Sequence, residues 1–495
     1  MGVAKLAAAR GQTMITRRDL AAGAGAMALA GCVRSGDLYM PAPRDRQFPA
    51  DFLWGVATSS YQTEGALDAD GRGQSIWDVF PRERIHDGSD ASVAVDSYHR
   101  YAEDVALIAD AGLKAYRFSI AWPRIVPDGE SAQQLTPGGW DGFNRAGVDY
   151  YSRLIDALLA RGVTPHATLF HWDLPQHLQE RGGWTSRDTA QRFADYASII
   201  GETLGDRLKN IVVLNEAAVH AVLGHVIGEH APGLRDADKL GAVIHHQNLA
   251  QGMAIQAMRA GRSDLKIGTT MALMPSRPQK AFMPWLNELA AKGFDEVWNG
   301  AFLDPLLKGS YPGAAGDMVE SVVQGGDLAI TRQPVDFLGV NYYSPAYMRF
   351  NANAPSFIEP GEPPEGSERD AFNREVDPSG LYEMLERVRT QYGNPRVYIT
   401  ENGCSDPFSD GPADLEDDFR ITYLRNHIAA VKSAMEAGCD IGGYFHWTLL
   451  DNWEWAEGYR SKFGLVAHDR ATGARTPKRS YQWFGTLART GALDT

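Results

Sequence analysis

The chain contains 495 residues, of which 44% are hydrophobic, and carries a formal net charge of −14 at pH 7. The hydrophobic fraction is typical of a globular protein with a large core. The negative charge argues against nucleic acid and against an anionic membrane surface as partners. Length alone would suggest about three domains, whereas a single α/β barrel with insertions can also exceed ~400 residues.

Residues 1–31 are expected to be an export signal. Paired arginines, Arg17 and Arg18, precede a short apolar run over residues 20–30. That run is too short to span a bilayer, and the arrangement is similar to a secretory signal of the twin-arginine type. The letters "LAGC", ending at Cys32, resemble a bacterial lipoprotein cleavage box. They predict lipidation of Cys32 and an exported protein of the periplasm or cell envelope, with plain signal cleavage as the alternative.

Residues 32–47 are expected to form a short tether ahead of one folded domain, residues 48–488. Beyond Cys32 the chain contains only Cys404 and Cys439. So few cysteines in so long an exported chain form no disulfide framework. Both lie in strand-like segments and are expected to be small core residues, with their pairing left open.

From residue 48 onward an apolar strand, a polar end and a helical stretch recur in turn. The expected strands cover residues 52–62, 115–122, 163–171, 210–217, 265–273, 336–343, 395–403 and 441–451. Several are near-continuous apolar runs, which are typical of parallel strands buried on both faces. The pattern predicts an α/β fold, a single (β/α)8 TIM barrel with long βα loops forming an active-site pocket. The rival, a doubly wound open sheet, would require a Gly-rich phosphate turn after an early strand, which is not present.

Residues 351–380 are rich in proline, glycine and glutamate. Because they follow an expected strand, they should form a long loop on the carboxyl-terminal face of the barrel. Active sites lie on that face in this fold, so the loop is expected to shape the pocket entrance. Plain surface disorder is the alternative.

Polar or aromatic side chains lie at nearly every expected strand end. They are Gln62, Arg117, His171, Asn215, Glu216, Asn341, Tyr343, Glu401 and Trp447. In a barrel of parallel strands these ends converge on the active site. A purely structural barrel has no reason to place polar groups at so many of its ends, so these residues are the candidate functional site.

Two of these residues, Glu216 and Glu401, are carboxylic acids after the fourth and seventh expected strands. Paired carboxylates across a pocket are the chemistry of glycoside hydrolysis. The carboxyl groups lie ~5–5.5 Å apart in retaining enzymes and ~6.5–9.5 Å apart in inverting ones. The sequence alone does not provide that distance.

Seven motifs now make the chemistry more specific. In chain order they read "FLWGVATSSYQTEG", "AYRFSIAWPRI", "HWDLPQ", "LNE", "NYYS", "ITENG" and "WTLLDNWEWAEGY". Together they resemble glycoside hydrolase family 1, the β-glucosidase family of retaining (β/α)8 enzymes, over residues 48–485. The chain departs from the usual family pattern at Val213 and Ala217, where threonine and proline are usual, and these departures are expected to affect the hydrogen bonding of Glu216.

The resemblance implies that Glu401 is the nucleophile and Glu216 the general acid/base. Arg117 would lie beside Glu401 and keep it ionised, and Asn215 would hydrogen-bond the 2-hydroxyl of the sugar. The other residues that the resemblance implies in substrate binding are Gln62, His171, Asn341, Tyr343, Trp447, Glu454, Trp455 and Phe463. Among them Trp447 would form the stacking floor and Phe463 the wall near the 6-position, whereas Trp453 is expected to be a buried aromatic residue.

Physical reasoning fits the two carboxyl roles. With Glu401 ionised nearby, Glu216 should hold its proton, because two like charges close together are unfavourable. Once the sugar esterifies Glu401 that repulsion disappears, so Glu216 becomes a better base for activating water.

The expected function is therefore a retaining exo-acting β-glycosidase, with β-glucosidase favoured, acting on terminal β-D-glucosyl residues through a covalent glycosyl-enzyme. Glu454 would repel a sugar phosphate, which favours non-phosphorylated glycosides. A β-galactosidase or β-fucosidase of the same family and a catalytically weak glycan-binding lipoprotein are the alternatives. No cofactor, metal or nucleic acid is expected, since His220, His225 and His230 have no recognised metal spacing, and a membrane would be contacted only through the lipid anchor.

Overall fold

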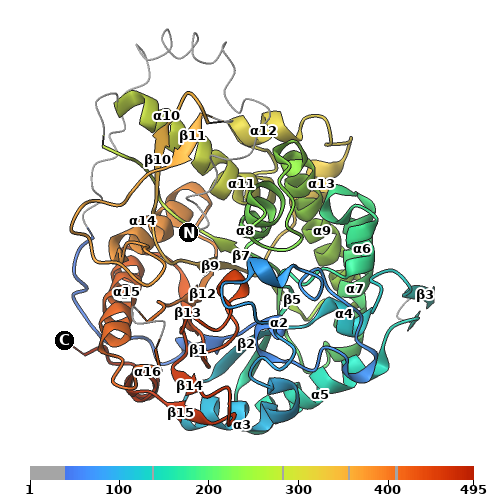
Figure 1. Cartoon of the computed structure of the whole chain (residues 1–495), viewed down its shortest axis with the longest axis horizontal. Helices are drawn as coiled ribbons and strands as arrows, with labels where there is room; N and C mark the ends of the chain where they lie inside the picture. The colour runs from blue at the N-terminus through green and yellow to red at the C-terminus, as the bar shows by residue number, and fades with distance from the viewer. Residues whose placement is uncertain (1–39, 137–138, 281–283, 355–356, 407–410, 495) are drawn as a thin grey trace.

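A computed structural model describes residues 40–494, apart from 137–138, 281–283, 355–356 and 407–410. The predicted export signal and Cys32 lie outside the described residues. Parallel strands close into a barrel in the order β1-β13-β12-β9-β7-β6-β5-β2, which confirms the predicted fold (Figure 1). Their bounds are β1 (Leu53–Ala57), β2 (Ala115–Ser119), β5 (Thr164–Phe170), β6 (Asn210–Asn215), β7 (Lys266–Ala272), β9 (Phe337–Asn341), β12 (Val397–Asn402) and β13 (Ile441–Trp447).

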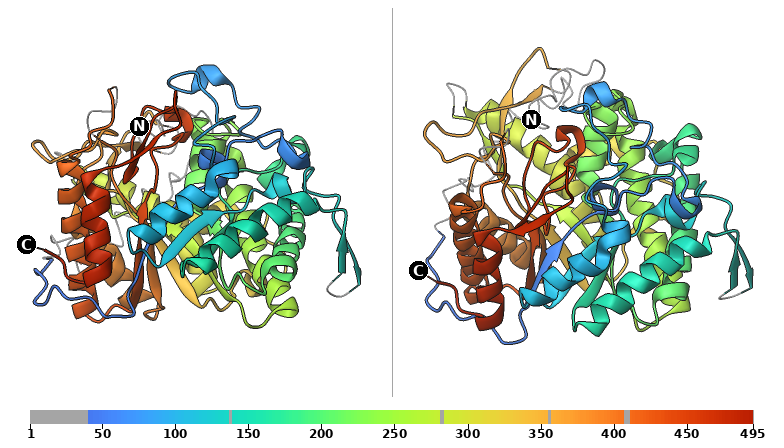
Figure 2. Two further views of the ribbon diagram at one scale, coloured as in Figure 1. Left: turned by 90° about the horizontal axis from the view of Figure 1, so that it is seen from below. Right: turned by 60° about the horizontal axis from the view of Figure 1, so that its bottom comes forward.

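Helices surround the barrel on all sides (Figures 1 and 2). The longer ones are α3 (Ser97–Asp110), α5 (Arg145–Ala160), α7 (Asp188–Leu204), α9 (Leu240–Gly261), α10 (Pro284–Asp295), α14 (Pro378–Gln391), α15 (Asp418–Glu436) and α16 (Arg479–Thr490). In α5 the buried side chains Val148, Tyr151, Ile155 and Leu158 recur every three or four residues, which gives the helix one apolar face toward the strands. The strands are buried on both faces, as their apolar sequences predict; β6 is buried along Ile211–Asn215.

The expected strands all occur, each shorter than predicted, and the first is shortened most. After β1 ends at Ala57, residues Ser60–Thr63 form a helical turn, α2. Two hydrogen bonds favour this turn. The Ser60 backbone N–H donates to Ser119 Oγ on β2 at 2.7 Å, and within the turn Thr63 Oγ1 donates to the Ser59 carbonyl at 2.7 Å. Gln62 therefore lies on a helical turn beyond the strand.

The predicted long loop is partly ordered into a small sheet. Strand β10 (Ala346–Phe350) pairs antiparallel with β11 (Ile358–Pro360) and parallel with β8 (Ser276–Pro278). Helix α14 then begins at Pro378, where the Asp377 carboxylate accepts a hydrogen bond from the Ser379 backbone N–H at 3.0 Å. Loop residues 360–363 and 371–375 line a cavity at the carboxyl ends of the strands.

Residues 40–47, the described part of the predicted tether, lie against the barrel. The Arg44 and Asp45 backbone N–H groups donate to the Glu436 carboxylate at 2.9 and 3.0 Å, and Lys432 Nζ donates to the Gln47 carbonyl at 2.8 Å. Within the described ranges no helix is long and apolar enough to cross a membrane.

Cys404 and Cys439 are both buried and free. They are small core residues, as predicted, and the pairing that the sequence left open does not occur.

The close approach of strands around β9 allows no side chain at Gly339. A Cβ atom there would lie 2.2 Å from Thr270 Oγ1 and 2.8 Å from Thr400 Oγ1. We therefore expect Gly339→Ala to lower the free energy of unfolding by about 1–3 kcal/mol through overpacking, measured by thermal or urea denaturation. Gly325→Ala is the control, because a Cβ at Gly325 has nothing within 4 Å. Equal stability of the two variants would contradict this account of the strand packing.

Candidate active site

The carboxyl ends of the strands surround a cavity of about 420 Å³. Eight of the predicted site residues line it, namely His171, Glu216, Tyr343, Glu401, Trp447, Glu454, Trp455 and Phe463. The other four, Gln62, Arg117, Asn215 and Asn341, lie directly behind this wall and are hydrogen-bonded to it. The structure thus brings together side chains that are separated by up to hundreds of residues in the chain.

Glu401, near the end of β12, is held by two donors. Arg117 Nη1 donates to Glu401 Oε1 at 2.5 Å, and the Tyr343 hydroxyl donates to Oε2 at 2.8 Å. The Arg117 side chain is completely buried and that of Glu401 nearly so. Because a buried charge is costly unless it is paired and hydrogen-bonded, this arrangement is what permits an ionised carboxylate at this position.

An amide network connects Glu401 to Glu216. Arg117 Nη2 donates to Asn215 Oδ1 at 2.6 Å, and Asn341 Nδ2 donates both to Asn215 Oδ1 at 3.1 Å and to Glu216 Oε1 at 2.9 Å. Thr400 Oγ1 in turn donates to Asn341 Oδ1 at 2.7 Å. The network fixes Asn341 with its amide toward Glu216, so the two carboxyl groups are oriented by one set of buried partners.

The backbone of Glu216 is held in a rarely populated conformation. Its φ is +48° and ψ is 54°, in the left-handed region that costs a residue with a side chain of order 1 kcal/mol or more. The Glu216 backbone N–H donates to the Thr270 carbonyl at 3.0 Å, and Ala217 begins the short helix α8 (Ala217–Ala221). Such strain at a strand-to-helix junction is common at functional sites.

The surroundings separate the acidities of the two carboxyl groups. Burial, and then the nearby charge of Glu401, raise the pKa of Glu216 to about 8. Burial also raises the pKa of Glu401, but the Arg117 charge and the hydrogen bonds from Arg117 and Tyr343 oppose that rise. Because the Arg117 cation lies beside Glu401 while Glu216 accepts from a neutral amide, the surroundings favour the proton on Glu216 and the negative charge on Glu401.

Gln62 supports Glu454 from behind. Gln62 Nε2 donates to Glu454 Oε2 at 2.9 Å and to the Trp453 carbonyl at 3.0 Å, and Gln62 Oε1 accepts from Ser59 Oγ at 2.7 Å. Burial raises the pKa of Glu454 to about 8, although the Arg374 charge and Gln62 oppose it. Glu454 thus faces the cavity with one carboxylate oxygen anchored, and Gln62 orients it.

One ring nitrogen of His171, Nδ1, is available to hydrogen-bond a ligand in the cavity. Asn215 Nδ2 lies 3.0 Å from His171 Nε2, and His171 Nδ1 has no partner among the described residues. Burial lowers the pKa of His171 well below its usual value, so the ring is neutral. With Nε2 accepting from Asn215, Nδ1 carries the proton and is available as a donor to a ligand.

Aromatic rings form the rest of the wall. The His171 ring stacks on Trp447 and Trp455 with ring centroids 5.7 and 5.9 Å away. Trp453 lies behind them, buried against other aromatic rings, and donates from Nε1 to Ser89 Oγ at 3.1 Å, which agrees with the predicted structural role. Flat apolar faces beside polar groups suit a sugar ring, whose C–H face packs on aromatic rings.

Sequence reasoning missed many residues of the cavity wall, among them Trp172 and Arg374. Trp172, directly after His171, lines the cavity and donates from Nε1 to the Asn215 carbonyl at 3.0 Å; its place in the motif "HWDLPQ" could have indicated it. Arg374 lies in the long loop and also lines the cavity, where no motif or periodicity indicates it. The described residues contain no group of three or more His, Cys, Asp or Glu side chains placed to bind a metal.

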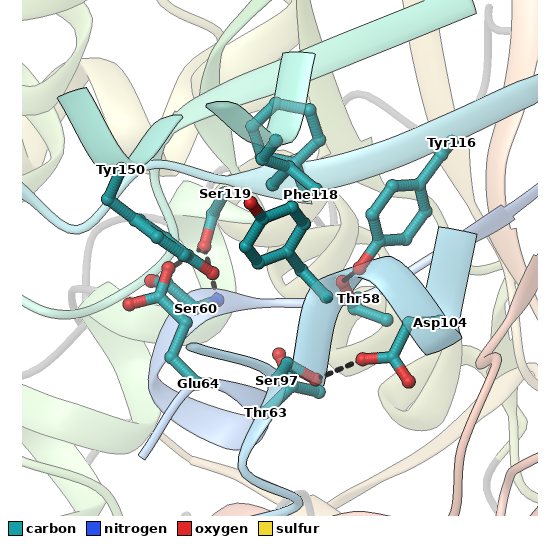
Figure 3. Close-up of a pocket in the computed structure, with 12 residues that line it drawn as sticks. Thr58, Ser60, Thr63, Glu64, Ser97, Asp104, Tyr116, Phe118, Ser119 and Tyr150 are labelled. Carbon is teal, nitrogen blue, oxygen red and sulfur yellow. Dashed lines mark hydrogen bonds between the residues drawn. The ribbon is translucent and has the colours of Figure 1, made fainter. Parts of the chain in front are cut away.

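A second, smaller cavity of about 20 Å³ lies between β2, α3, α5 and the α2 turn (Figure 3). Its polar groups pair with one another: Ser97 Oγ donates to Asp104 Oδ2 at 2.7 Å, and Ser119 Oγ donates to Ser60 Oγ at 2.9 Å. This volume suits about one water molecule. Ser60 belongs to the same turn, α2, as Gln62, so its hydrogen bond with Ser119 helps to hold Gln62 in place.

Comparisons with known proteins agree with this geometry. The family model "Glycosyl hydrolase family 1" matches residues 44–492. The chain is 38% identical over 460 residues to Beta-glucosidase A of Thermotoga maritima, covering 91% of this chain and 99% of that protein. It is 38% identical to a bifunctional beta-D-glucosidase/beta-D-fucosidase of Bifidobacterium breve, covering 88% and 97%.

The structure is also similar to a solved family 1 b-glucosidase from Thermotoga maritima. The TM-score is 0.84 at 38% sequence identity, and the match covers 91% of this chain and all of the other. A family model that spans nearly the whole folded part and relatives of this identity lead to one conclusion: the chain belongs to glycosyl hydrolase family 1.

Proposed function

We propose that the protein is a retaining exo-acting β-glucosidase that removes terminal, non-phosphorylated β-D-glucosyl residues. The observation that carries the proposal is the pair of carboxyl groups with divided roles. Glu401 is held ionised by Arg117 and Tyr343, and Glu216, with its raised pKa, retains a proton. The relatives' printed name, Beta-glucosidase, supports the choice of sugar.

In the first step, Glu401 attacks the anomeric carbon while Glu216 donates its proton to the glycosidic oxygen. The bond to the leaving group breaks as the ester bond to Glu401 forms. Esterification removes the charge of Glu401, which is one cause of the raised pKa of Glu216. Glu216, now a carboxylate, then takes a proton from water, and the resulting hydroxyl displaces Glu401 from the sugar.

The remaining side chains place the sugar. We assign Glu454 and His171 Nδ1 to its hydroxyl groups and Trp447 to its C–H face, because these groups line the cavity. Burial raises the pKa of Glu454 to about 8, so the ionised form, present at higher pH, is the one that disfavours a phosphorylated sugar by repulsion. Cleavage of β-fucosides is a second candidate activity, favoured by the similarity to the bifunctional relative. A mere glycan-binding role is disfavoured, since both carboxyl groups and their supporting network are present.

The roles are tested by hydrolysis of p-nitrophenyl β-D-glucoside. We expect Glu401→Gln to lose activity by on the order of 10³-fold or more, because no nucleophile remains. Glu216→Gln should retain more activity, since p-nitrophenolate leaves without a proton. Glu362→Gln is the control, because Glu362 lines the same cavity but its side chain is 71% exposed. Comparable activity in Glu401→Gln and the wild type would refute the proposal.

The pH dependence follows from the two pKa shifts. The first step requires Glu216 protonated, so kcat/KM should fall as the pH rises above about 8. It requires Glu401 ionised, so kcat/KM should also fall at acidic pH, as protonation removes the nucleophile. Because the groups interact, the two apparent pKa values belong to the pair. On cellobiose, whose leaving group needs the proton of Glu216, a kcat/KM profile that stays flat to alkaline pH would count against Glu216 as the acid.

The sequence around Cys32 supports a further proposal, that the protein is exported and anchored to the cell envelope through a lipid on Cys32. In a bacterial host, we expect the full chain to fractionate with membranes and Cys32→Ser to release it into the soluble fraction. A wild-type protein found only in the soluble fraction would contradict lipidation.

A further inference from the structure

The loop between β11 and α14 contains a turn built around one buried carboxylate. Asp370 Oδ1 accepts hydrogen bonds from the backbone N–H groups of Phe372 and Arg374 at 2.9 and 3.1 Å. Asp370 Oδ2 accepts from Arg374 Nε at 2.9 Å and from Nη2 at 2.5 Å. Asp370 therefore fixes both the backbone and the side chain of Arg374, so the turn presents one guanidinium in a defined place.

That guanidinium lies among the rings of the cavity wall. Its Cζ is 4.6 Å from the Phe372 ring centroid, 4.9 Å from that of Tyr343 and 5.7 Å from that of Phe463. Such stacking holds the cation in place on several sides. Tyr343 also donates to Glu401, so Arg374 lies one side chain away from the nucleophile.

One guanidinium nitrogen remains available. Nε and Nη2 of Arg374 are both engaged by Asp370, whereas Nη1 has no hydrogen-bond acceptor among the described residues. Arg374 lines the cavity. An immobilised cationic donor that faces a substrate cavity is suited to bind an oxygen atom of a ligand.

We propose that Arg374 Nη1 hydrogen-bonds a hydroxyl oxygen of the leaving group and so selects glycosides in which that group is a second sugar. Arg374 belongs to a loop added beyond the strand ends, whereas the ring that reacts is held at the strand ends by Glu401 and Trp447. The Arg374 side chain is 25% exposed and that of Glu401 only 4%, so Arg374 lies nearer the mouth of the cavity. The leaving group of an exo-acting enzyme extends toward that mouth, so Arg374 meets the part of the substrate beyond the glycosidic bond.

The charge of the cavity favours a neutral hydroxyl over an anion. In the part of the chain that the structure describes, two cations line the cavity, and each is paired with an acid: Arg374 with Asp370 and Arg460 with Glu457. Besides the catalytic pair and Glu454, the acids of the wall are Glu229, Glu362, Glu375 and Glu457. A carboxylate on the leaving group would enter this acidic surrounding at a cost. Part of the wall is apolar, with Val219, Leu223, Met274 and Trp298, and can pack against the C–H face of a second sugar.

This inference rests on the proposed β-glucosidase function, and the experiment separates the two. The full chain, Arg374→Met, Arg374→Lys and the control Arg369→Met are assayed on cellobiose, phenyl β-D-glucoside and 4-carboxyphenyl β-D-glucoside. Arg369 lies in the same loop, where Nη1 donates to Asn373 Oδ1 at 2.8 Å, and it does not line the cavity. Wild-type turnover of phenyl β-D-glucoside tests the function itself, because phenol offers no hydroxyl to Arg374.

For Arg374→Met we expect kcat/KM on cellobiose to fall about tenfold to hundredfold, the effect of losing a charged hydrogen bond. On phenyl β-D-glucoside it should change less than about threefold. Arg374→Lys keeps a cationic donor and should recover part of the cellobiose activity, and Arg369→Met should leave the ratio between substrates unchanged. The lysine variant also provides the test should Arg374→Met fail to fold.

Equal losses on cellobiose and phenyl β-D-glucoside would overturn the inference, because they would place Arg374 at the reacting sugar or in the support of Tyr343. A loss confined to 4-carboxyphenyl β-D-glucoside would overturn it as well, because the ligand would then be an anion. If the wild type hydrolyses phenyl β-D-glucoside and one of these two results is found, the proposed β-glucosidase function still holds and only the role of Arg374 is refuted.

Discussion

The buried ion pair between Arg117 and Glu401 is the interaction on which the rest of the site depends. An ionised carboxylate at the centre of a barrel would be prohibitively unfavourable by itself. Arg117 lies on β2 and Glu401 on β12, so the pair links strands separated in the barrel by β1 and β13. The remaining guanidinium nitrogens engage Thr168 and Asn215. Removal of Arg117 would therefore leave a charge and several polar groups without partners at once.

Two chemically identical side chains acquire opposite roles through this pairing. Glu401 has a cation and a phenol hydroxyl as partners, whereas the side-chain partner of Glu216 among the described residues is a neutral amide donor, Asn341. The difference assigns the proton to Glu216 before substrate arrives. Since the charge on Glu401 disappears when the sugar is attached, the same geometry reverses the preference of Glu216 midway through the reaction. No movement of the protein is required for this change of role.

Most of this arrangement could be predicted from the sequence, because a closed barrel brings the ends of strands that are far apart in the chain close together in space. Residues at the carboxyl ends of buried parallel strands all lie around the same cavity. His171, Asn215, Glu216 and Glu401 could therefore be assigned to the site from the sequence. Gln62 was placed at a strand end but lies on a helical turn, because side-chain hydrogen bonds from serine and threonine competed with the strand pattern. Arg374 was not predicted, since its place depends on a turn held by Asp370, and such contacts leave no periodic trace in the sequence.

Residues 40–47 have a consequence for how the enzyme meets its substrate. They lie beside the last turn of α15, at Glu436, and lead into the amino end of β1 (Figure 2). The cavity opens at the carboxyl ends of the strands, so residues 40–47 and the mouth of the cavity lie at opposite ends of the barrel. A support that held the protein at residues 40–47, whether a surface or an immobilising resin, would leave the mouth directed outward. Glycosides diffusing in from bulk solution would then reach the carboxyl pair without first passing between the protein and its support.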